Sequence, residues 1–215
     1  MKRFFIALAA TIGLGSAASA QNLLFENPDN KPYFGARVGL DVTSTAGETY
    51  DTYTNGAGFN VGAIYNIPVV KNFYFEPGLS LFYNTFGQEI SVDADFPIEI
   101  KTSIRNFGFR VPFNFGYRFD FTDDMSIYIY TGPVLNINIT AKEHFDGNGT
   151  MVSSTHSLMG NGFKRADMQW DFGVGYSYNN LYVQVGGGVG VTKVFSSAVE
   201  SFRRNTFNLA VGYNF

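Results

Sequence analysis

Cysteine is absent from this sequence of 215 residues, and histidine occurs only twice. A chain without thiols forms neither disulfides nor thiolate metal sites. Beyond its N-terminal segment, the sequence also lacks any run approaching the roughly 20 consecutive apolar residues that a membrane-spanning helix needs. These absences exclude a disulfide scaffold and a helical membrane protein.

Charge of either sign is sparse, since 15 Lys and Arg stand against 18 Asp and Glu and the net charge is −3. Nothing in this balance points to a nucleic-acid partner. Aromatic residues are abundant, at 17%, and they occur together with 24 glycines. That pairing is unusual for a soluble globule and favours a barrel with aromatic belts and a crowded interior.

The first 20 residues differ in kind from the rest. Lys2 and Arg3 precede an apolar run over residues 4–14. Small residues then follow at Ala18-Ser19-Ala20. This pattern predicts a secretory signal peptide that is cut before Gln21. We therefore divide the chain into a signal peptide, a periplasmic lead segment and one barrel domain, over residues 1–20, 21–32 and 33–215.

Apolar residues recur with a period of two through most of the domain, which indicates β-strands with two unlike faces. In the first segment Phe34, Ala36 and Val38 share one face, while Gly35 and Arg37 share the other. The fifth segment alternates most weakly, because both of its faces are partly apolar. The eight predicted strands are residues 33–42, 59–67, 73–84, 106–119, 126–140, 167–176, 181–191 and 206–215.

A soluble β-sandwich also alternates, so three further features separate the two architectures. The segments run about 10 residues or more, as a tilted strand needs to cross the hydrocarbon layer, whereas soluble strands average about 5–6. One face holds Gly, Asn, Ser and charged residues, which cannot form a dry core. Aromatic residues gather at the segment ends around an aliphatic middle, as expected of two interfacial belts.

The connections between the segments alternate in length. The short ones span residues 68–72, 120–125 and 177–180, and the long ones span 43–57, 86–104, 141–165 and 195–203. Three turns and four loops are what an eight-stranded barrel with both ends on one side requires. The sequence thus predicts an all-β, eight-stranded antiparallel up-and-down transmembrane β-barrel in an outer membrane, with periplasmic termini and extracellular loops.

Four segments resemble a known family: residues 33–40 (YFGARVGL), 75–80 (FEPGLS), 109–117 (FRVPFNFGY) and 209–215 (LAVGYNF). They are similar to the outer-membrane β-barrel domain family common in Bacteroidetes, which includes PorT-like proteins. For PorT-like members the resemblance implies a link to protein secretion and gliding. It also implies that Tyr213 and Phe215 form a C-terminal aromatic signal for the outer-membrane assembly machinery.

Seven charged residues share the polar parity of the strands and are expected to face the barrel interior: Arg37, Asp41, Glu76, Arg110, Arg118, Asp167 and Asp171. The interior of an eight-stranded barrel is just wide enough for side chains to fill it. We therefore predict that these charges pair with one another and plug the lumen. The alternative is a narrow ion path, which would need a continuous file of water.

Both histidines, His144 and His156, fall in the third predicted loop near serines 153, 154 and 157. Some eight-stranded outer-membrane barrels are lipid-modifying enzymes that use His and Ser near the outer leaflet. We predict that the protein is not an enzyme, because a loop containing residues 146–149 (DGNG) does not hold a nucleophile and a base in fixed geometry. We predict no catalytic residue, cofactor or metal.

The predicted function is that of a structural or interaction protein whose external loops form a recognition surface. Acidic and aromatic residues in the loops could bind a protein, or divalent cations that bridge lipopolysaccharide. The predicted partners are outer-membrane lipid and lipopolysaccharide, the assembly machinery, and an extracellular or secretion-system protein. The alternatives are a lipid-modifying enzyme, a small-solute pore and a PorT-like accessory protein of a secretion system.

Overall fold

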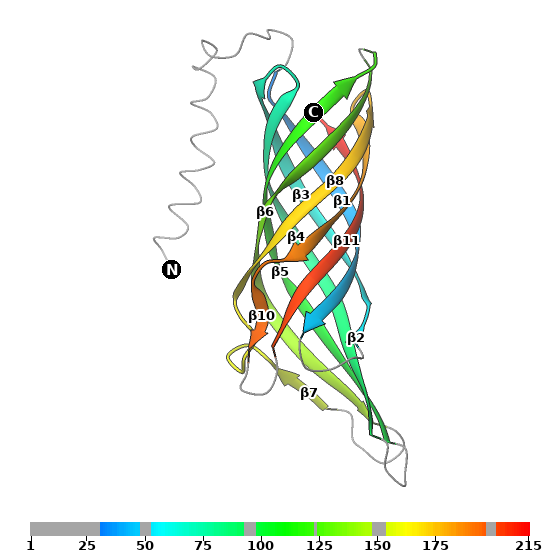
Figure 1. Ribbon diagram of the computed structural model, residues 1–215, viewed down its shortest axis with the longest axis vertical. Helices are drawn as coiled ribbons and strands as arrows, with labels where there is room; N and C mark the ends of the chain where they lie inside the picture. Colours follow the sequence, from blue (N-terminus) through cyan, green and yellow to red (C-terminus); the bar gives the residue numbers. More distant parts are fainter. Residues whose placement is uncertain (1–30, 48–52, 93–97, 123, 148–153, 197–200) are drawn as a thin grey trace.

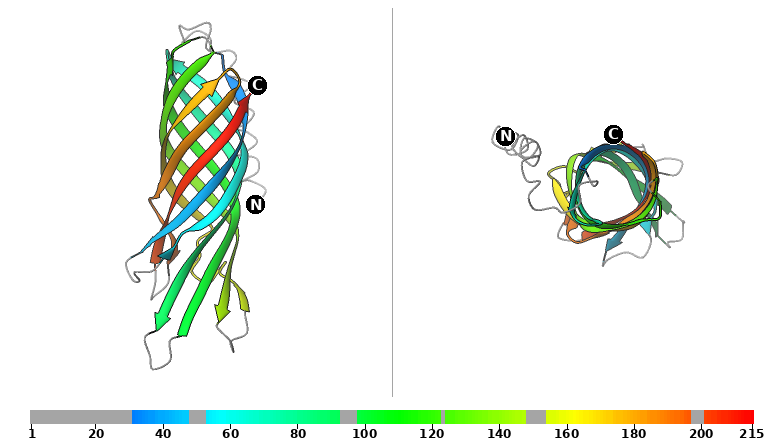
Figure 2. Two further views of the ribbon diagram at one scale, coloured as in Figure 1. Left: turned by 90° about the vertical axis from the view of Figure 1, so that its right-hand side faces the viewer. Right: turned by 90° about the horizontal axis from the view of Figure 1, so that it is seen from above.

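A computed structural model describes residues 31–47, 53–92, 98–122, 124–147, 154–196 and 201–215. Within these ranges eight long antiparallel strands close into a barrel (Figures 1 and 2). The all-β, eight-stranded up-and-down fold predicted from the alternation is confirmed. The predicted signal peptide lies outside the described residues. Across the described ranges, no helix is long and apolar enough to cross a membrane.

The barrel wall consists of β1 (Tyr33–Gly47), β3 (Gly56–Val70), β4 (Phe73–Val92), β5 (Ile98–Asp120), β6 (Met125–Gly147), β8 (Ala166–Tyr178), β9 (Leu181–Gly190) and β11 (Ser201–Asn214). Each strand pairs with the next, and β1 pairs with β11 to close the sheet. Three short strands, β2 (Tyr53–Thr54), β7 (Ser154–Ser157) and β10 (Lys193–Ser196), extend the sheet at one end. A closed barrel pairs its backbone groups without a free edge, which a lipid environment requires.

The two ends of the barrel differ in their connections. At the turn end, the strands are joined through residues 71–72, 121–124 and 179–180, and here β1 begins and β11 ends. Lys71 and Asn179, the first residues of the two shortest turns, each adopt a left-handed φ of 51°, as tight hairpin turns need. The opposite end carries the long connections, and we call it the loop end.

Side chains alternate between an outward and an inward face, as predicted. Phe34 and Leu40 of β1 point outward and are 61% and 65% exposed. In the weakly alternating β6, Ile127, Ile129 and Ile139 are all exposed and lie on the outward face. A band of exposed apolar side chains around a whole barrel is stable in lipid rather than in water.

Aromatic rings cluster on the outward face near the turn end. The rings of Phe34 and Tyr65 lie 4.4 Å apart, and those of Phe73 and Tyr117 lie 4.7 Å apart in an edge-on arrangement. Girdles of aromatic residues mark the membrane–water interfaces of such barrels, and tyrosine is enriched there because its ring is amphipathic. This cluster therefore marks one interface of the bilayer.

The predicted loop at residues 86–104 is wrong over most of its length, and the one at 141–165 is wrong over part of it. β4 continues to Val92, β5 begins at Ile98 and β6 continues to Gly147. Together with β7, these extensions form a projecting sheet beyond the rim of the barrel (Figure 2). The alternation is weak there because a sheet with water on both faces needs no apolar face, although its backbone ladder continues. The loops at 43–57 and 195–203 are likewise shortened by β1, β2, β3, β10 and β11.

The inward face is not uniformly polar, which corrects the expectation of Gly, Asn, Ser and charge alone. At the loop end an apolar cap closes the lumen, and it consists of Phe86, Ile104, Ala141, Leu158, Phe163, Val194 and Phe202. Toward the turn end lies a tyrosine cluster of Ile64, Tyr74, Tyr128, Tyr130 and Tyr182. Large rings fill the interior because so many of the inward positions between them are glycine.

Candidate functional site

The structure places the seven predicted charges inside the barrel wall. Five of them are buried, namely Arg37, Asp41, Glu76, Arg110 and Asp167. Arg118 and Asp171 are half-buried. Because an unpaired charge is costly to bury, the partners of these groups decide what the lumen can do.

Asp41 of β1 is held at the middle of the barrel by three other strands. Its Oδ1 accepts hydrogen bonds from Nδ2 of Asn60, at 3.0 Å, and from Nδ2 of Asn208, at 2.7 Å. The same oxygen lies 3.5 Å from Nη1 of Arg110. Asn60, Asn208 and Arg110 belong to β3, β11 and β5, so this carboxylate connects strands from opposite sides of the wall.

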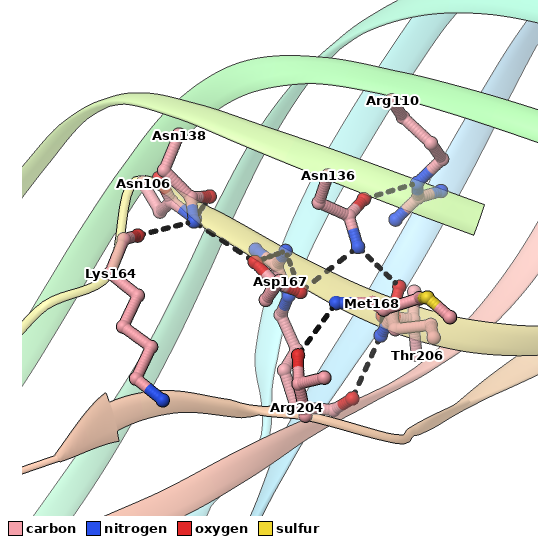
Figure 3. A network of polar contacts seen from close by, with 11 residues as sticks. Asn106, Arg110, Asn136, Asn138, Lys164, Asp167, Met168, Arg204 and Thr206 are labelled. Carbon is pink, nitrogen blue, oxygen red and sulfur yellow. Dashed lines mark hydrogen bonds and ion pairs between the residues drawn. The ribbon is translucent and has the colours of Figure 1, made fainter.

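Asp167 of β8 forms a second, closer ion pair with Arg204 of β11 (Figure 3). Nη2 of Arg204 donates to both carboxylate oxygens, at 2.9 and 2.8 Å. Asn136 and Asn138 donate to the same two oxygens, at 3.0 and 2.9 Å. The two charged side chains are only 0% and 1% exposed. The two asparagines thus satisfy the buried carboxylate, whereas Nε and Nη1 of Arg204 have no hydrogen-bond partner among the described residues.

Asn136 joins the two ion pairs. Its Oδ1 accepts from Nε of Arg110 at 3.4 Å, while its Nδ2 donates to Asp167. The guanidinium groups of Arg110 and Arg204 also lie over the ring of Phe82, at 5.6 and 5.1 Å from its centre. We call this connected set the lumen network: Asp41, Arg110, Asn136, Asp167 and Arg204.

Arg204 is a member of this network that the sequence analysis missed. The last strand was expected to begin at residue 206, whereas β11 begins at Ser201. The inward parity of Thr206 and Asn208 extends back to Arg204, so the alternation of the sequence already indicates an inward position for Arg204. The alternation is difficult to recognise there because two consecutive arginines followed by an asparagine resemble a solvated loop.

The remaining predicted charges make no direct ion pair with another residue in the described ranges. Arg118 instead donates to the hydroxyl of Tyr33 and lies over the rings of Tyr33 and Tyr74. Glu76 accepts a hydrogen bond from Asn66 at 3.1 Å. Of the seven predicted charges, only Asp41 and Arg110 form an ion pair with each other in the described ranges. Asp167 pairs with Arg204, which was not among the seven.

Little space remains in the middle of the lumen. A cavity lined by Arg37, Arg110 and Asp171 measures about 20 Å³, which is room for about one water molecule. A vestibule of about 250 Å³ opens at the turn end, and Tyr74, Tyr128 and Tyr182 of the tyrosine cluster line it. Between this vestibule and the apolar cap lie the buried side chains of the lumen network.

The two histidines lie on paired strands, which corrects their expected position in a loop. Strands β6 and β7 align Glu143 with His156 and His144 with Thr155. Because neighbouring residues of a strand point to opposite faces, the two imidazoles lie on opposite sides of this hairpin. Nδ1 of His144 is 3.1 Å from Oγ1 of Thr155. No group of three or more His, Asp or Glu that could hold a metal occurs in the described ranges.

The predicted assembly signal lies at the end of β11. Tyr213 and Phe215 point outward and are 44% and 74% exposed, and their rings make an edge-on contact at 5.2 Å. The backbone N–H of Phe215 donates to the carbonyl of Phe34 on β1. The strand end is thus accessible from the lipid, and its role in assembly stays a prediction.

Solved structures of outer-membrane barrels are similar to this chain. Ail, the attachment invasion locus protein of Yersinia pestis, in complex with the heparin analogue sucrose octasulfate, is 15% identical over 86% of this chain and 100% of that one, with a TM-score of 0.40. Neisserial surface protein A is 12% identical over 86% and 100%, with a TM-score of 0.46. The outer membrane enzyme PagL is 14% identical over 80% and 98%, with a TM-score of 0.39.

No curated protein matches the chain. A family model does, and it covers residues 6–215 under the description outer membrane protein beta-barrel domain. The match includes every strand described above, and the outward apolar band is the surface that such a location demands. The chain therefore belongs to the outer membrane protein beta-barrel domain family and is an outer-membrane β-barrel protein.

Proposed function

We propose that this protein is a non-conducting outer-membrane anchor that presents its projecting sheet outside the cell as a recognition surface. The observation that supports this function is the combination of a filled lumen with strands that continue beyond the barrel.

The filled lumen argues against the small-solute pore. Ion conduction needs a continuous file of water, and the cavity at the middle holds about one molecule. The lumen network and the apolar cap lie in series along the axis, so opening one would leave the other in place. The interior is best explained as a rigid core that holds the strands in register.

The projecting sheet supplies the surface for recognition. β5 and β6 are each 23 residues long, whereas β9 crosses the barrel with 10. At about 3.3 Å per residue, the surplus corresponds to roughly 40 Å of additional strand. Long loops of outer-membrane barrels lie outside the cell, which gives this sheet access to external partners.

The edges of the projecting sheet indicate how a partner could bind. β2 covers β4 only at Gly87 and Gln88, and past this point no other described strand pairs with that edge of β4. β7 is likewise paired on one side, by β6, within the described ranges. Open edges bind extended peptide segments through backbone hydrogen bonds. The resemblance to PorT-like proteins of Bacteroidetes adds a secretion-system protein as a candidate partner.

We infer no hydrolytic role for the histidines. Acyl transfer by a Ser–His pair requires the imidazole within hydrogen-bond reach of the nucleophile. His144 contacts Thr155, and Ser157 lies across from Lys142 rather than from a histidine. The placement of the two imidazoles on opposite faces of one hairpin also prevents them from acting together.

Planar-bilayer recording tests the non-conducting anchor. The purified protein is inserted at increasing amounts, with a general porin as the positive control. We expect a conductance equal to that of the protein-free bilayer. Stable unitary steps whose number grows with the amount of folded protein would instead establish the pore.

Site-specific photocrosslinking in intact cells tests recognition by the projecting sheet. A photoreactive amino acid replaces Thr155, which is exposed on β7, or Thr122, which is exposed at the turn end. We expect a discrete adduct from position 155 that does not form from position 122. Adducts of equal pattern from both positions, or from neither, would contradict a recognition role for the sheet.

A further inference from the structure

A row of hydrogen-bond donors crosses the outward side of the barrel at the loop end. Thr85 of β4 lies across from Arg105 of β5, and Arg105 lies across from Lys142 of β6. Lys142 in turn lies across from Ser157 of β7. Directly opposed residues share one face of a sheet. We call these four residues the donor row. The hydroxyl of Thr85 donates to the backbone carbonyl of Ala57 at 2.7 Å, so the other three residues supply the donors for a ligand.

Among the described residues, the two cations at the centre of this row have no ion-pair partner. Arg105 and Lys142 are exposed, and the side chain of neither forms an ion pair or hydrogen bond with another residue in the described ranges. Glu143 is the neighbour of Lys142 and therefore points to the opposite face. Like charges directly opposed across two strands destabilise a sheet. An anion bound between them removes that repulsion.

The height of the row on the barrel indicates where the anion comes from. Phe107, two residues from Arg105 on β5, lies across from Tyr83, which lies across from Phe59. The rings of Phe59 and Tyr83 are 5.8 Å apart and belong to the outward face. Rings of this kind mark the membrane interface, so the cations, roughly 7 Å further along the strand, reach the level of the lipid headgroups.

Other cations lie at the same end of the barrel. Lys164, Arg165 and Arg203 are exposed there, and Arg203 lies across from Lys193. Long basic side chains extend from an apolar wall toward headgroups with their charge in the polar layer. The outward surface above the rings is therefore suited to a lipid with several negative charges.

We propose that the donor row binds the phosphate groups of lipopolysaccharide in the outer leaflet. Arg105 and Lys142 supply the positive charge, and the hydroxyl of Ser157 supplies a further donor. A phosphate group offers several acceptor oxygens, and guanidinium groups bind it with two parallel hydrogen bonds. This proposal requires only that the protein lies in the outer membrane. It does not depend on recognition by the projecting sheet.

Lipopolysaccharide binding by charge-removing variants tests this site. Wild-type protein and the variants R105Q, K142Q and R105Q/K142Q are placed in phosphatidylcholine nanodiscs and titrated with lipopolysaccharide. Each cation near a membrane surface contributes about a five-fold change in affinity, so we expect about thirty-fold weaker binding by the double variant. The control K31Q removes one charge at the turn end and is expected to bind as wild type does.

A stability measurement separates binding from folding. In phosphatidylcholine alone, K142Q is expected to unfold at the same temperature as wild type or a higher one, because the repulsion from Arg105 is gone. Dephosphorylated lipopolysaccharide should bind wild type and the double variant equally. Equal affinity of both proteins for intact lipopolysaccharide would overturn the proposal. Complete displacement of lipopolysaccharide by millimolar inorganic phosphate would show that the site binds free phosphate rather than the lipid.

Discussion

Tyr128 of β6 lies directly across from Gly175 of β8, and its ring covers the glycine so closely that a Cβ at position 175 would lie 2.0 Å from the tyrosine Cζ. The same relationship holds for the other tyrosines of the cluster, which cover their cross-strand neighbours in the pairs Tyr74–Gly116, Tyr130–Gly173 and Tyr182–Gly212. An aromatic ring over a strand glycine fills the space of the missing side chain. The tyrosine cluster is thus built from paired rings and glycines.

Substitution of the glycine under Tyr128 tests this pairing. G175A places a methyl group inside the ring, and we expect a loss of about 1–3 kcal/mol in the free energy of unfolding, as for other overpacked cores. Urea unfolding in lipid vesicles measures it. G187A on the neighbouring strand is the control, because its Cβ would point outward and meet only a backbone oxygen, at 3.0 Å, before atoms at 4.0 Å. An equal loss from both variants would show that the ring is not the cause.

Removal of one charge from the buried ion pair tests the lumen network. D167N leaves Arg204 buried without its counter-charge, and we expect a loss of about 3–5 kcal/mol in the free energy of unfolding. D171N makes the same chemical change at a half-buried residue without a direct ion pair, so its effect should be smaller. The double variant D167N/R204Q should lose less than the sum of its two single changes. Strict additivity would contradict a coupled pair.

The apolar cap is expected to contribute to stability as a protein core does. F86A removes a ring that is 2% exposed and contacts Phe202 edge-on at 5.9 Å, so we expect a loss of about 3–5 kcal/mol. F113A on β5 removes a ring that faces lipid, where acyl chains can fill the vacated space, and its cost should be lower. Unfolding in vesicles compares the two. A greater loss of unfolding free energy from F113A than from F86A would show that the lipid-facing surface contributes more to stability than the apolar cap does.

The C-terminal signal is expected to act on assembly rather than on stability. F215A removes an outward ring that is 74% exposed, so the unfolding free energy of the refolded protein should change little. In cells we expect less heat-modifiable protein in the outer membrane if, as the family resemblance implies, the terminal aromatic residue is the signal for the assembly machinery. F215Y keeps a ring and should assemble normally. Normal assembly of F215A would remove Phe215 from the signal.

The faces of the strands could be predicted from the sequence, but their ends could not. The wall of a barrel separates lipid from lumen, so each residue within it carries a local signal of apolar or polar character. That signal assigns Arg37, Asp41 and Arg110 to the inward face, and all three are buried in the structure. It is absent outside the bilayer, which is why the sequence predicts loops where β4, β5 and β6 continue.

The two corrections to the interior have a related cause. Arg204 was hidden by a polar run at the start of its strand, and the members of the apolar cap come from segments that alternate poorly. The sequence does not show which residues Arg204 or the apolar cap contact, because the parity of a residue specifies only the face of the strand on which it lies. The histidines were misplaced for the same reason, since pairing of β6 with β7 depends on a partner strand rather than on local composition.

The sequence by itself determined that this chain is an eight-stranded outer-membrane barrel, since a period of two, aromatic strand ends and alternating connection lengths are local properties. Only the tertiary structure decided which residues meet. Arg204 reaches Asp167 across 37 residues of sequence, and Tyr128 covers Gly175, because the register of a closed barrel must satisfy all its strands at once. The register depends on the pairing of all eight strands around the barrel, so it cannot be derived from the sequence of any one strand.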